Sequence, residues 1–241
     1  MKAMRVIAFV AVALMVPALA WAAPGDGIQG TKHDFSGKGS PPSGMCTFCH
    51  TPHGGLQTLL LWNHKLSTNT FQWDVPSTTA GTPFPTFKGD TYKGPSAKCL
   101  SCHDGTVAIG DVNRWNGGPA SIDNTKVSGV FQIAAASGAM AGNHPVTMPY
   151  PYQNTASTYN GTKTGGAAYL DEWQATPLDP VRMFNDDGAG NIVAGAVAGK
   201  TGIECSSCHD PHNKKAVGDL FLRGTLGGNT TAYICLKCHV K

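Results

Sequence analysis

Hydrophobic residues in this chain seldom recur with the period of an amphipathic helix. After an apolar run at residues 6–20, they occur in short groups separated by Gly, Ser, Thr and Asn. Two short segments, residues 127–133 and 191–197, are strand-like, and each is bounded by Gly, Ser or Asn. The pattern therefore predicts a mostly irregular, loop-rich fold with short helices and few short strands.

The apolar run at residues 6–20 has the features of a signal peptide. Lys2 and Arg5 precede it, and residues 20–22, Ala-Trp-Ala, form a small-x-small cleavage site. We therefore predict a signal peptide over residues 1–22, with export to the periplasm or to the extracellular cell surface. No later stretch approaches the roughly 20 apolar residues that a helix needs to cross a bilayer, so we expect no membrane span in the mature chain.

Composition adds a second constraint on the fold. Charged residues make up 14% of the chain, against about 25% in ordinary soluble domains. The chain also contains 30 glycines and 16 prolines. Such a chain cannot offset its conformational entropy with side-chain burial alone, so we expect its folding to depend on a bound group. The formal net charge is only +3 and there is no Lys/Arg run, so we expect no nucleic-acid partner.

All eight cysteines belong to four copies of Cys-x-x-Cys-His, numbered here I to IV in chain order. In c-type haem attachment, the two thiols bond the porphyrin edge and the adjacent imidazole ligates the iron. A disulfide framework or a structural zinc site gives no reason for a histidine at the same offset four times. We therefore predict four haem c groups that organise the core. The attachment thiols are those of Cys46, Cys49, Cys99, Cys102, Cys205, Cys208, Cys235 and Cys238, and the proximal iron ligands are His50, His103, His209 and His239.

Five further histidines are candidates for the distal position on four irons, namely His33, His53, His64, His144 and His212. With imidazole on both faces, no iron keeps an open position for substrate. Complete bis-histidine ligation therefore favours an electron carrier over an enzyme. The alternative is a multihaem reductase with one open-coordinate haem, for which the sequence shows neither a shortage of histidines nor a Cys-x-x-Cys-Lys variant.

The spacing of His53 and His212 restricts the haems that they can reach. Each lies three residues after a proximal histidine, which is too short a span for the chain to pass around a macrocycle to the opposite face of the same iron. Each must therefore ligate a different haem if it ligates one at all. For His212 we expect haem IV, which is near in sequence. For His53 we expect another haem of this chain or one in a neighbouring molecule.

The other three candidates differ in their surroundings. His33 lies in a Gly-rich arm long enough to reach over a haem, at roughly 3.3 Å per extended residue. His144 precedes a proline, which holds the local backbone extended. His64 follows the apolar residues 59–62 and could equally be a packed histidine bonded to a backbone carbonyl. We therefore take His64 as the spare member of the five.

Two weaker ligand patterns remain as alternatives. A methionine could replace one distal histidine and raise the potential, and the mature chain offers Met45, Met140, Met148 and Met183. Residues 185–191 resemble an oxygen-rich calcium loop but lack the glutamate that would complete an EF-hand. A turn is the preferred interpretation of that segment.

The motifs divide the mature chain into an N-terminal arm, a segment with haems I and II, a Gly/Ala/Thr-rich middle segment and a segment with haems III and IV. Their predicted bounds are residues 23–45, 46–120, 121–200 and 201–241. The last segment, with Cys205-Ser-Ser-Cys-His-Asp-Pro-His212 and Ile234-Cys-Leu-Lys-Cys-His239, resembles the doubled-CXXCH module of multihaem cytochromes c.

Flanking sequences extend this resemblance over most of the mature chain. They are Lys32-His-Asp34, Cys46-Thr-Phe-Cys-His-Thr-Pro-His53, Leu61-Trp-Asn-His64, Cys99-Leu-Ser-Cys-His-Asp-Gly-Thr106 and Asn143-His-Pro-Val146. The chain is also similar to tetrahaem cytochromes that polymerise into extracellular conducting filaments. The resemblance implies electron transfer to redox partner proteins or extracellular acceptors. It leaves open whether this chain is a soluble monomer or a filament subunit.

Overall fold

The computed structural model describes residues 22–39, 44–55, 60–73, 84–164, 167–228 and 230–240. The predicted signal peptide lies outside this range except for its last residue. Within it, the chain is mostly loops and turns, as the sequence pattern predicts, and strands have at most five residues. The described helices are α1 (Pro95–His103), α2 (Cys205–Cys208) and the 3-10 turns η1 (Gly129–Phe131), η2 (Tyr152–Asn154), η3 (Ala167–Glu172) and η4 (Ile234–Lys237). No helix in the described part is long and apolar enough to cross a membrane.

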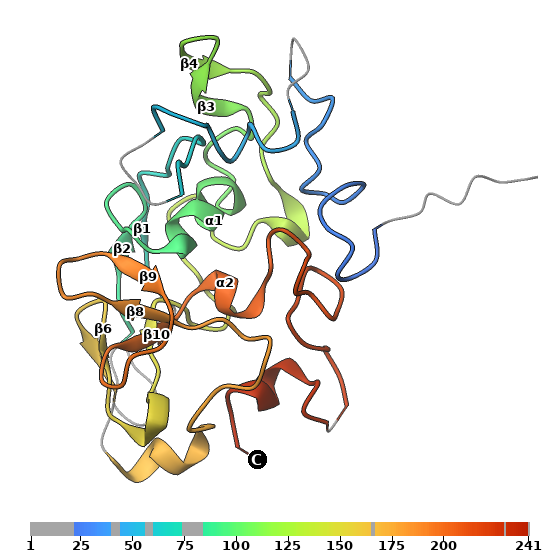
Figure 1. The fold of residues 1–241 in the computed structure, drawn as a ribbon. Coiled ribbons are helices and arrows are strands. Elements are labelled where there is room, and N and C mark those ends of the chain that lie inside the picture. The colour runs from blue at the N-terminus through green and yellow to red at the C-terminus, as the bar shows by residue number, and fades with distance from the viewer. Residues whose placement is uncertain are drawn as a thin grey trace, which may run out of the picture.

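The described strands form one small antiparallel sheet and three hairpins (Figure 1). The sheet has the order β5-β10-β8-β9, and Gly202 of β10 pairs with Pro149 of β5 and with Phe184 of β8. Its strands are β5 (Met148–Pro149), β8 (Phe184–Asp186), β9 (Ile192–Ala194) and β10 (Thr201–Ile203). The hairpins pair β1 (Thr70–Phe71) with β2 (Phe87–Lys88), β3 (Asp111–Trp115) with β4 (Gly118–Ser121), and β6 (Thr158–Tyr159) with β7 (Thr162–Lys163).

Buried apolar side chains of the described residues form three small clusters. The first packs Phe71 and Leu100 with their neighbours, the second packs Tyr150 and Ile203, and the third is built around Tyr159. Several large apolar side chains remain exposed elsewhere, including Leu60, Phe131 and Leu220. The backbone carbonyl of each of these three residues accepts a hydrogen bond from a histidine of a Cys-x-x-Cys-His motif. An apolar porphyrin is the kind of surface that would cover them.

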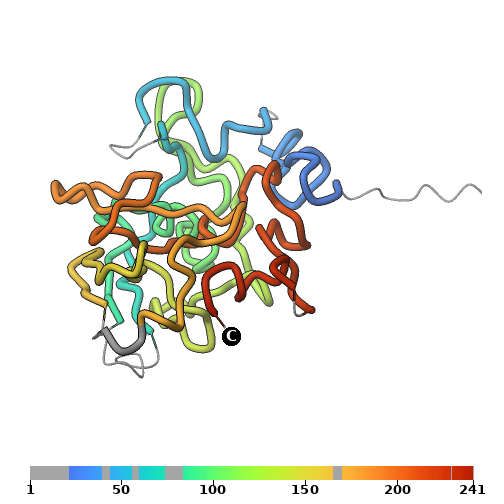
Figure 2. The backbone as a smooth tube through the Cα atoms, turned by 60° about the horizontal axis from the view of Figure 1, so that its bottom comes forward, coloured from blue at the N-terminus to red at the C-terminus, as the bar shows by residue number. Residues whose placement is uncertain are grey.

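The N-terminal arm lies against the segment that follows motif III. The Asn213 carbonyl accepts the Gly27 amide (3.1 Å), and its side-chain amide donates to the Ala23 and Gly27 carbonyls (both 2.9 Å). Figures 1 and 2 show the blue arm beside the dark orange chain in both views. Because Asn213 is buried, this contact fixes the arm, and with it His33, near motif III.

The strand prediction for residues 127–133 is wrong. This segment is a loop that contains η1, and Gly129 at its start has a left-handed φ of 64°. The loop is shaped by its contacts with motif II: the Phe131 carbonyl accepts the His103 Nδ1–H (2.7 Å), and the Ile133 amide donates to the His103 carbonyl (2.9 Å). These contacts turn the backbone toward the histidine and override the local strand pattern.

The strand predicted at residues 191–197 is confirmed for Ile192–Ala194, which form β9 and pair with β8. The preceding residues 186–191 form the turn of this hairpin. The Asp187 Oδ1 accepts the Ala189 amide (2.7 Å) and the Asn191 amide (3.0 Å), and the Asp186 Oδ1 accepts the Gly188 amide (2.8 Å). These carboxylates therefore stabilise the turn, which is the interpretation that the sequence favoured for this segment.

We predict that the C-terminal segment needs its haem in order to fold. Its 3-10 turn η4 has only one buried residue, Lys237, whose ammonium group donates to the Asp179 carbonyl (2.6 Å). The double substitution Cys235→Ala and Cys238→Ala should remove one haem. We expect it to accelerate tryptic cleavage after Lys237 by about tenfold or more, because local opening then costs less free energy. Native-like protease resistance in a protein with one haem fewer would contradict this dependence.

Candidate haem sites

Each Cys-x-x-Cys-His motif makes a single helical turn. In motifs I, III and IV, the histidine amide donates to the carbonyl of the first cysteine, at 2.7, 3.0 and 2.9 Å respectively. Motif II forms the last turn of α1, and motif III begins at the first residue of α2. Residues three and four apart share one side of such a turn. The two thiols and the imidazole therefore project toward the same side, as covalent attachment and iron ligation together require.

Carbonyl groups orient the candidate proximal imidazoles of motifs I, II and III. The Nδ1–H of His50 donates to the Leu60 carbonyl and that of His209 to the Leu220 carbonyl, both at 2.8 Å, as His103 does to Phe131. A carbonyl oxygen can only accept, so Nδ1 carries the proton and the Nε2 lone pair is left for a metal. The sequence reasoning did not anticipate these carbonyl acceptors.

Three of the four proximal histidines, those of motifs I, II and IV, lie beside a second imidazole. The separation of the rings is the one that two imidazole ligands of one iron require. A ligating imidazole nitrogen lies about 2 Å from its metal and the ring centre about 1 Å beyond, so two rings on one iron have centroids about 6 Å apart. The observed centroid separations are 6.1 Å for His50 and His212, 6.2 Å for His33 and His103, and 6.5 Å for His144 and His239. The residues present therefore fit bis-histidine haem.

The candidate distal rings of His33 and His144 are oriented in the same way as the proximal ones. The His33 Nδ1–H donates to the Pro211 carbonyl (3.3 Å), and the His144 Nδ1–H donates to the Pro145 carbonyl (2.9 Å). Burial lowers the pKa of His33, which keeps its imidazole neutral as a metal ligand must be. In both residues, Nε2 is again the nitrogen left for iron.

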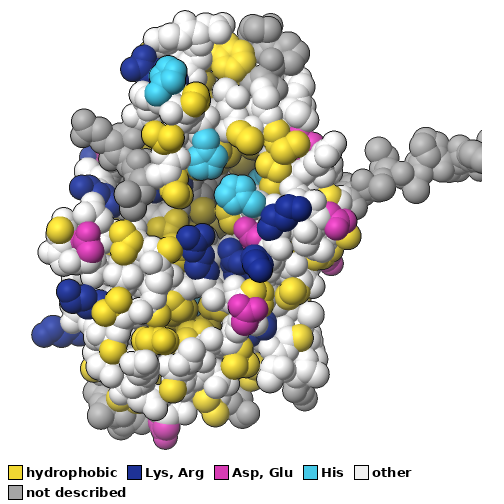
Figure 3. Space-filling view, in the orientation of Figure 1, with side chains coloured by type: hydrophobic (Ala, Val, Ile, Leu, Met, Phe, Trp, Pro, Cys, Tyr) yellow, Lys and Arg dark blue, Asp and Glu magenta, His cyan; other side chains and the backbone are white. Residues whose placement is uncertain are grey.

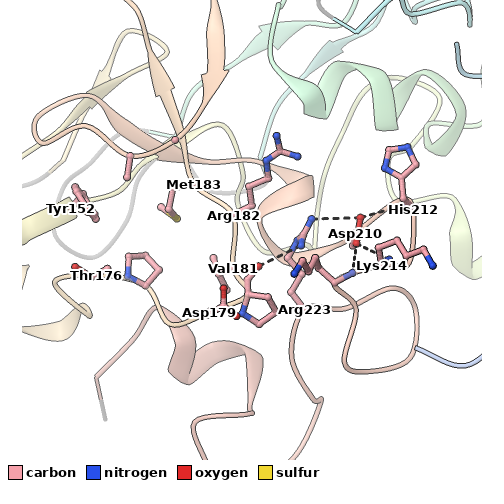
Figure 4. A pocket seen from close by; sticks show the side chains of 15 residues that line it. Tyr152, Thr176, Asp179, Val181, Arg182, Met183, Asp210, His212, Lys214 and Arg223 are labelled. Atoms are coloured by element: carbon pink, nitrogen blue, oxygen red, sulfur yellow. Dashed lines mark hydrogen bonds and ion pairs between the residues drawn. The ribbon is translucent and has the colours of Figure 1, made fainter. Parts of the chain in front are cut away.

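A buried ion pair shapes the loop that carries His212 (Figure 4). The Arg223 guanidinium lies 3.6 Å from the Asp210 carboxylate, and both residues are buried. The same carboxylate accepts the amides of His212 (3.2 Å) and Lys214 (2.8 Å). A cavity of about 710 Å³ opens beside this loop, with Met183 and several cationic side chains among its lining. The lining includes Asp179 and Asp210 but no attachment cysteine and no proximal histidine, so this cavity by itself does not define a haem site.

The haem that His212 faces differs from our expectation. We expected haem IV, but the structure places the His212 ring against His50 of motif I, with ring planes 19° apart. The reason is tertiary: the chain after His209 doubles back, with an isolated bridge between His209 and Leu222, and its tip lies toward motif I. Proximity in sequence was therefore a poor guide to the nearest iron site.

His64 has the surroundings of a packed histidine. It is 1% exposed, its Nδ1 lies 3.1 Å from the Ser101 hydroxyl, and its Nε2 lies 2.9 Å from the Ala108 carbonyl. Burial lowers its pKa, so the ring is neutral. Both ring nitrogens therefore have partners within the protein, and the Nε2 also lies 3.3 Å from the Cys102 Sγ of motif II.

Within the described residues, His53 and His209 have no second imidazole ring at the spacing found in the three histidine pairs. His53 is exposed, and within the described residues neither ring faces another imidazole across a gap near 6 Å. His53 lies in a short loop closed by the Thr51 hydroxyl, which donates to the His53 carbonyl (2.9 Å). Figure 3 shows that histidine side chains share one face with exposed hydrophobic groups and neighbouring Lys and Arg side chains.

Motifs I and III are structural repeats, which the sequence analysis did not recognise. The residue after each proximal histidine, Thr51 or Asp210, donates its amide to the carbonyl of a distant residue, Leu61 (3.0 Å) or Phe221 (2.8 Å). Both returning loops contain two consecutive non-glycine residues with positive φ, at 60–61 and 220–221. The shared signal in the sequence is Cys-x-x-Cys-His-x-Pro-His followed by Leu-Leu or Leu-Phe. His53 and His212 occupy equivalent positions in the two repeats.

Successive motifs are neighbours in space. The Cys99 thiol raises the pKa of Cys205, and the Cys205 amide donates to the Ser96 hydroxyl of α1 (3.0 Å), so motifs II and III adjoin. Burial, and after it the nearby Cys49 thiol, raises the pKa of Cys102, so motifs I and II adjoin. Burial and then the Cys208 thiol raise the pKa of Cys238 to about 12, so motifs III and IV adjoin as well. The attachment thiols thus follow one another in chain order.

Comparison with known proteins finds one family match. Residues 196–241 match the family model described as the doubled CXXCH motif, which spans motifs III and IV. A search of curated proteins found no match. The doubled motif indicates covalent binding of haem c and a role in electron transfer, and it supports a place among multihaem c-type cytochromes.

We predict that His64→Ala leaves every haem low-spin while destabilising the protein. The substitution leaves the Ala108 carbonyl without its imidazole donor in a buried site, which should cost about 2 kcal/mol of unfolding free energy. The Ser101 hydroxyl keeps the Lys98 carbonyl as its acceptor. Denaturant unfolding and the visible spectrum measure the two effects. His144→Ala is the matched control, because this exposed residue should convert one haem to a high-spin form with little loss of stability. A high-spin band in the His64 variant would mean that His64 is a ligand.

Proposed function

We propose that the protein is an exported electron carrier with four covalently bound haem c groups, each ligated by two histidines. The observation that carries the proposal is the centroid spacing of 6.1 to 6.5 Å in three histidine pairs that each join a motif histidine to a distant one. Haem c, when bound, supplies reversible one-electron exchange at its iron. Electrons would enter from a redox partner protein and leave to another partner or to an extracellular acceptor.

The pairs give a specific ligand for three of the haems. His212 serves haem I, His33 serves haem II and His144 serves haem IV. The carbonyl groups that accept the Nδ1–H atoms hold each ring in one tautomer and one orientation. These residues keep both faces of each iron closed to substrate. The contacts between thiols of successive motifs favour a continuous row of haems in the order I to IV.

Haem III then requires a distal ligand from elsewhere. His64 is engaged on both nitrogens, and three of the other four distal candidates are already paired. His53 is the remaining histidine, and it is exposed on a short loop. Its equivalent in the repeat, His212, serves a haem outside its own motif. We therefore assign haem III to His53 of a second copy of the chain.

This assignment implies self-assembly. A contact that joins His53 of one copy to motif III of the next uses two different surfaces, so it is heterologous. Such contacts repeat and produce either a closed ring or an open filament. A filament would extend the row of haems from one subunit into the next through a coordination bond.

The second candidate function is a multihaem reductase. One observation favours it: His209 faces no second imidazole within the described residues. An isolated chain would therefore have one haem with an open position for a small ligand such as nitrite. Strong binding of nitrite or cyanide by the assembled protein would favour this function, whereas binding only by the dissociated chain agrees with the electron carrier.

We predict that His53→Ala makes haem III five-coordinate and high-spin, while haem I stays attached and low-spin. The variant should also lose its assemblies, because the coordination bond between copies is gone. Absorption spectroscopy, resonance Raman spectroscopy and electron microscopy measure these changes.

Added imidazole provides the matched control for the His53 variant. It should restore the low-spin spectrum without restoring the assemblies, because free imidazole replaces the ligand but not the link. Four low-spin haems and an unchanged assembly size in His53→Ala would show that His53 ligates no iron.

A further inference from the structure

A buried glutamate lies at the junction of motifs II and III. The chain contains two glutamates, Glu172 and Glu204. Glu172 is exposed, whereas Glu204 is 0% exposed and immediately precedes Cys205. Within the described residues Glu204 makes no ion pair. Burial raises its pKa, and the buried Lys98 side chain of α1 is near enough for an electrostatic interaction with it.

The Glu204 carboxylate accepts hydrogen bonds from three parts of the chain. One oxygen accepts the hydroxyls of Tyr92 and of Tyr159 (2.7 Å), and the other accepts the Ser96 amide (3.0 Å). Ser96 lies in the first turn of α1, which ends with motif II. Tyr159 reaches the carboxylate across Gly202 of β10, where its ring leaves no room for a Cβ. The glutamate therefore joins α1, β6 and the start of α2.

A second hydrogen bond ties the same two helices in the opposite direction. The Cys205 amide donates to the Ser96 hydroxyl (3.0 Å), and the Ser207 hydroxyl accepts the Glu204 amide (3.0 Å). The residues that these bonds join are more than 100 positions apart in sequence, yet the bonds hold the start of α2 against the first turn of α1. The attachment edges of haems II and III would meet at this junction.

We propose that Glu204 is a positioning residue that fixes the separation of haems II and III. The inference rests on the proposed attachment of haem at motifs II and III and adds the group that sets their distance. Electron hopping between haems falls steeply with their separation, so a fixed junction keeps this step of the row fast. Without the carboxylate, two hydroxyls and one amide lose their acceptor in a buried site, and the helices can move apart.

The test compares three variants of the full holoprotein: Glu204→Ala, Glu204→Gln and the exposed control Glu172→Ala. Mass spectrometry of haem-bearing peptides reports attachment, and Soret circular dichroism reports coupling between neighbouring haems. We expect Glu204→Ala to retain four haems but to lose Soret coupling amplitude. Glu204→Gln should restore the amplitude, because its amide can still bridge the serine amide and the tyrosine hydroxyls. The Glu172 variant should match the wild type.

Unchanged coupling in Glu204→Ala, or failure of Glu204→Gln to restore it, overturns the positioning role. If Glu204→Ala does not accumulate, the milder variants Tyr92→Phe and Tyr159→Phe decide, because each removes one hydroxyl donor to the carboxylate. Reduced coupling with four haems in either variant supports the role, and unchanged coupling in both overturns it. Failure of the proposed function gives a different result. In that case the wild-type protein itself lacks haem on the peptides of motifs II and III.

Discussion

The proposed bis-histidine ligation requires two imidazole rings about 6 Å apart with their Nε2 atoms free, and three histidine pairs of the structure have this spacing. A chain with few charges, many glycines and short strands has little regular structure with which to hold distant residues together. Loops instead hold the imidazole rings in place. In each loop a backbone carbonyl accepts the Nδ1–H of a histidine. The carbonyls of Leu60, Phe131 and Leu220 do this for the proximal rings of motifs I to III. The loops that look irregular are therefore the elements that define the sites.

Under the proposed function, the repeat of motifs I and III accounts for the way in which copies of the chain would assemble. In both repeats a proline precedes a histidine that lies three residues after the proximal one. One of these histidines, His212, meets a haem position of the same chain, and the other, His53, is exposed. A second copy that approaches motif III would use the same local chemistry that already operates within the chain. The proposed contact between copies therefore needs no new type of interaction.

Sequence alone predicted the chemistry of the sites better than their arrangement. The eight cysteines and the irregular fold follow from motifs and composition, because both are local properties. The partner of His212 could not be predicted, because it depends on how the loop after motif III folds back under the Asp210–Arg223 ion pair. The strand expected at residues 127–133 failed for a similar reason, since contacts with His103 reshape it. The junction at Glu204 joins residues too distant in sequence for any local pattern to reveal.

The central claim is that the chain's own histidines close both faces of every iron once the subunits are assembled. Near-infrared magnetic circular dichroism of the fully oxidised, assembled protein tests this claim most directly, because it separates His/His, His/Met and high-spin haems in one spectrum. The account predicts four low-spin haems per chain, all with the His/His signature. A His/Met band, or a high-spin haem that persists in the assembled protein, would contradict it.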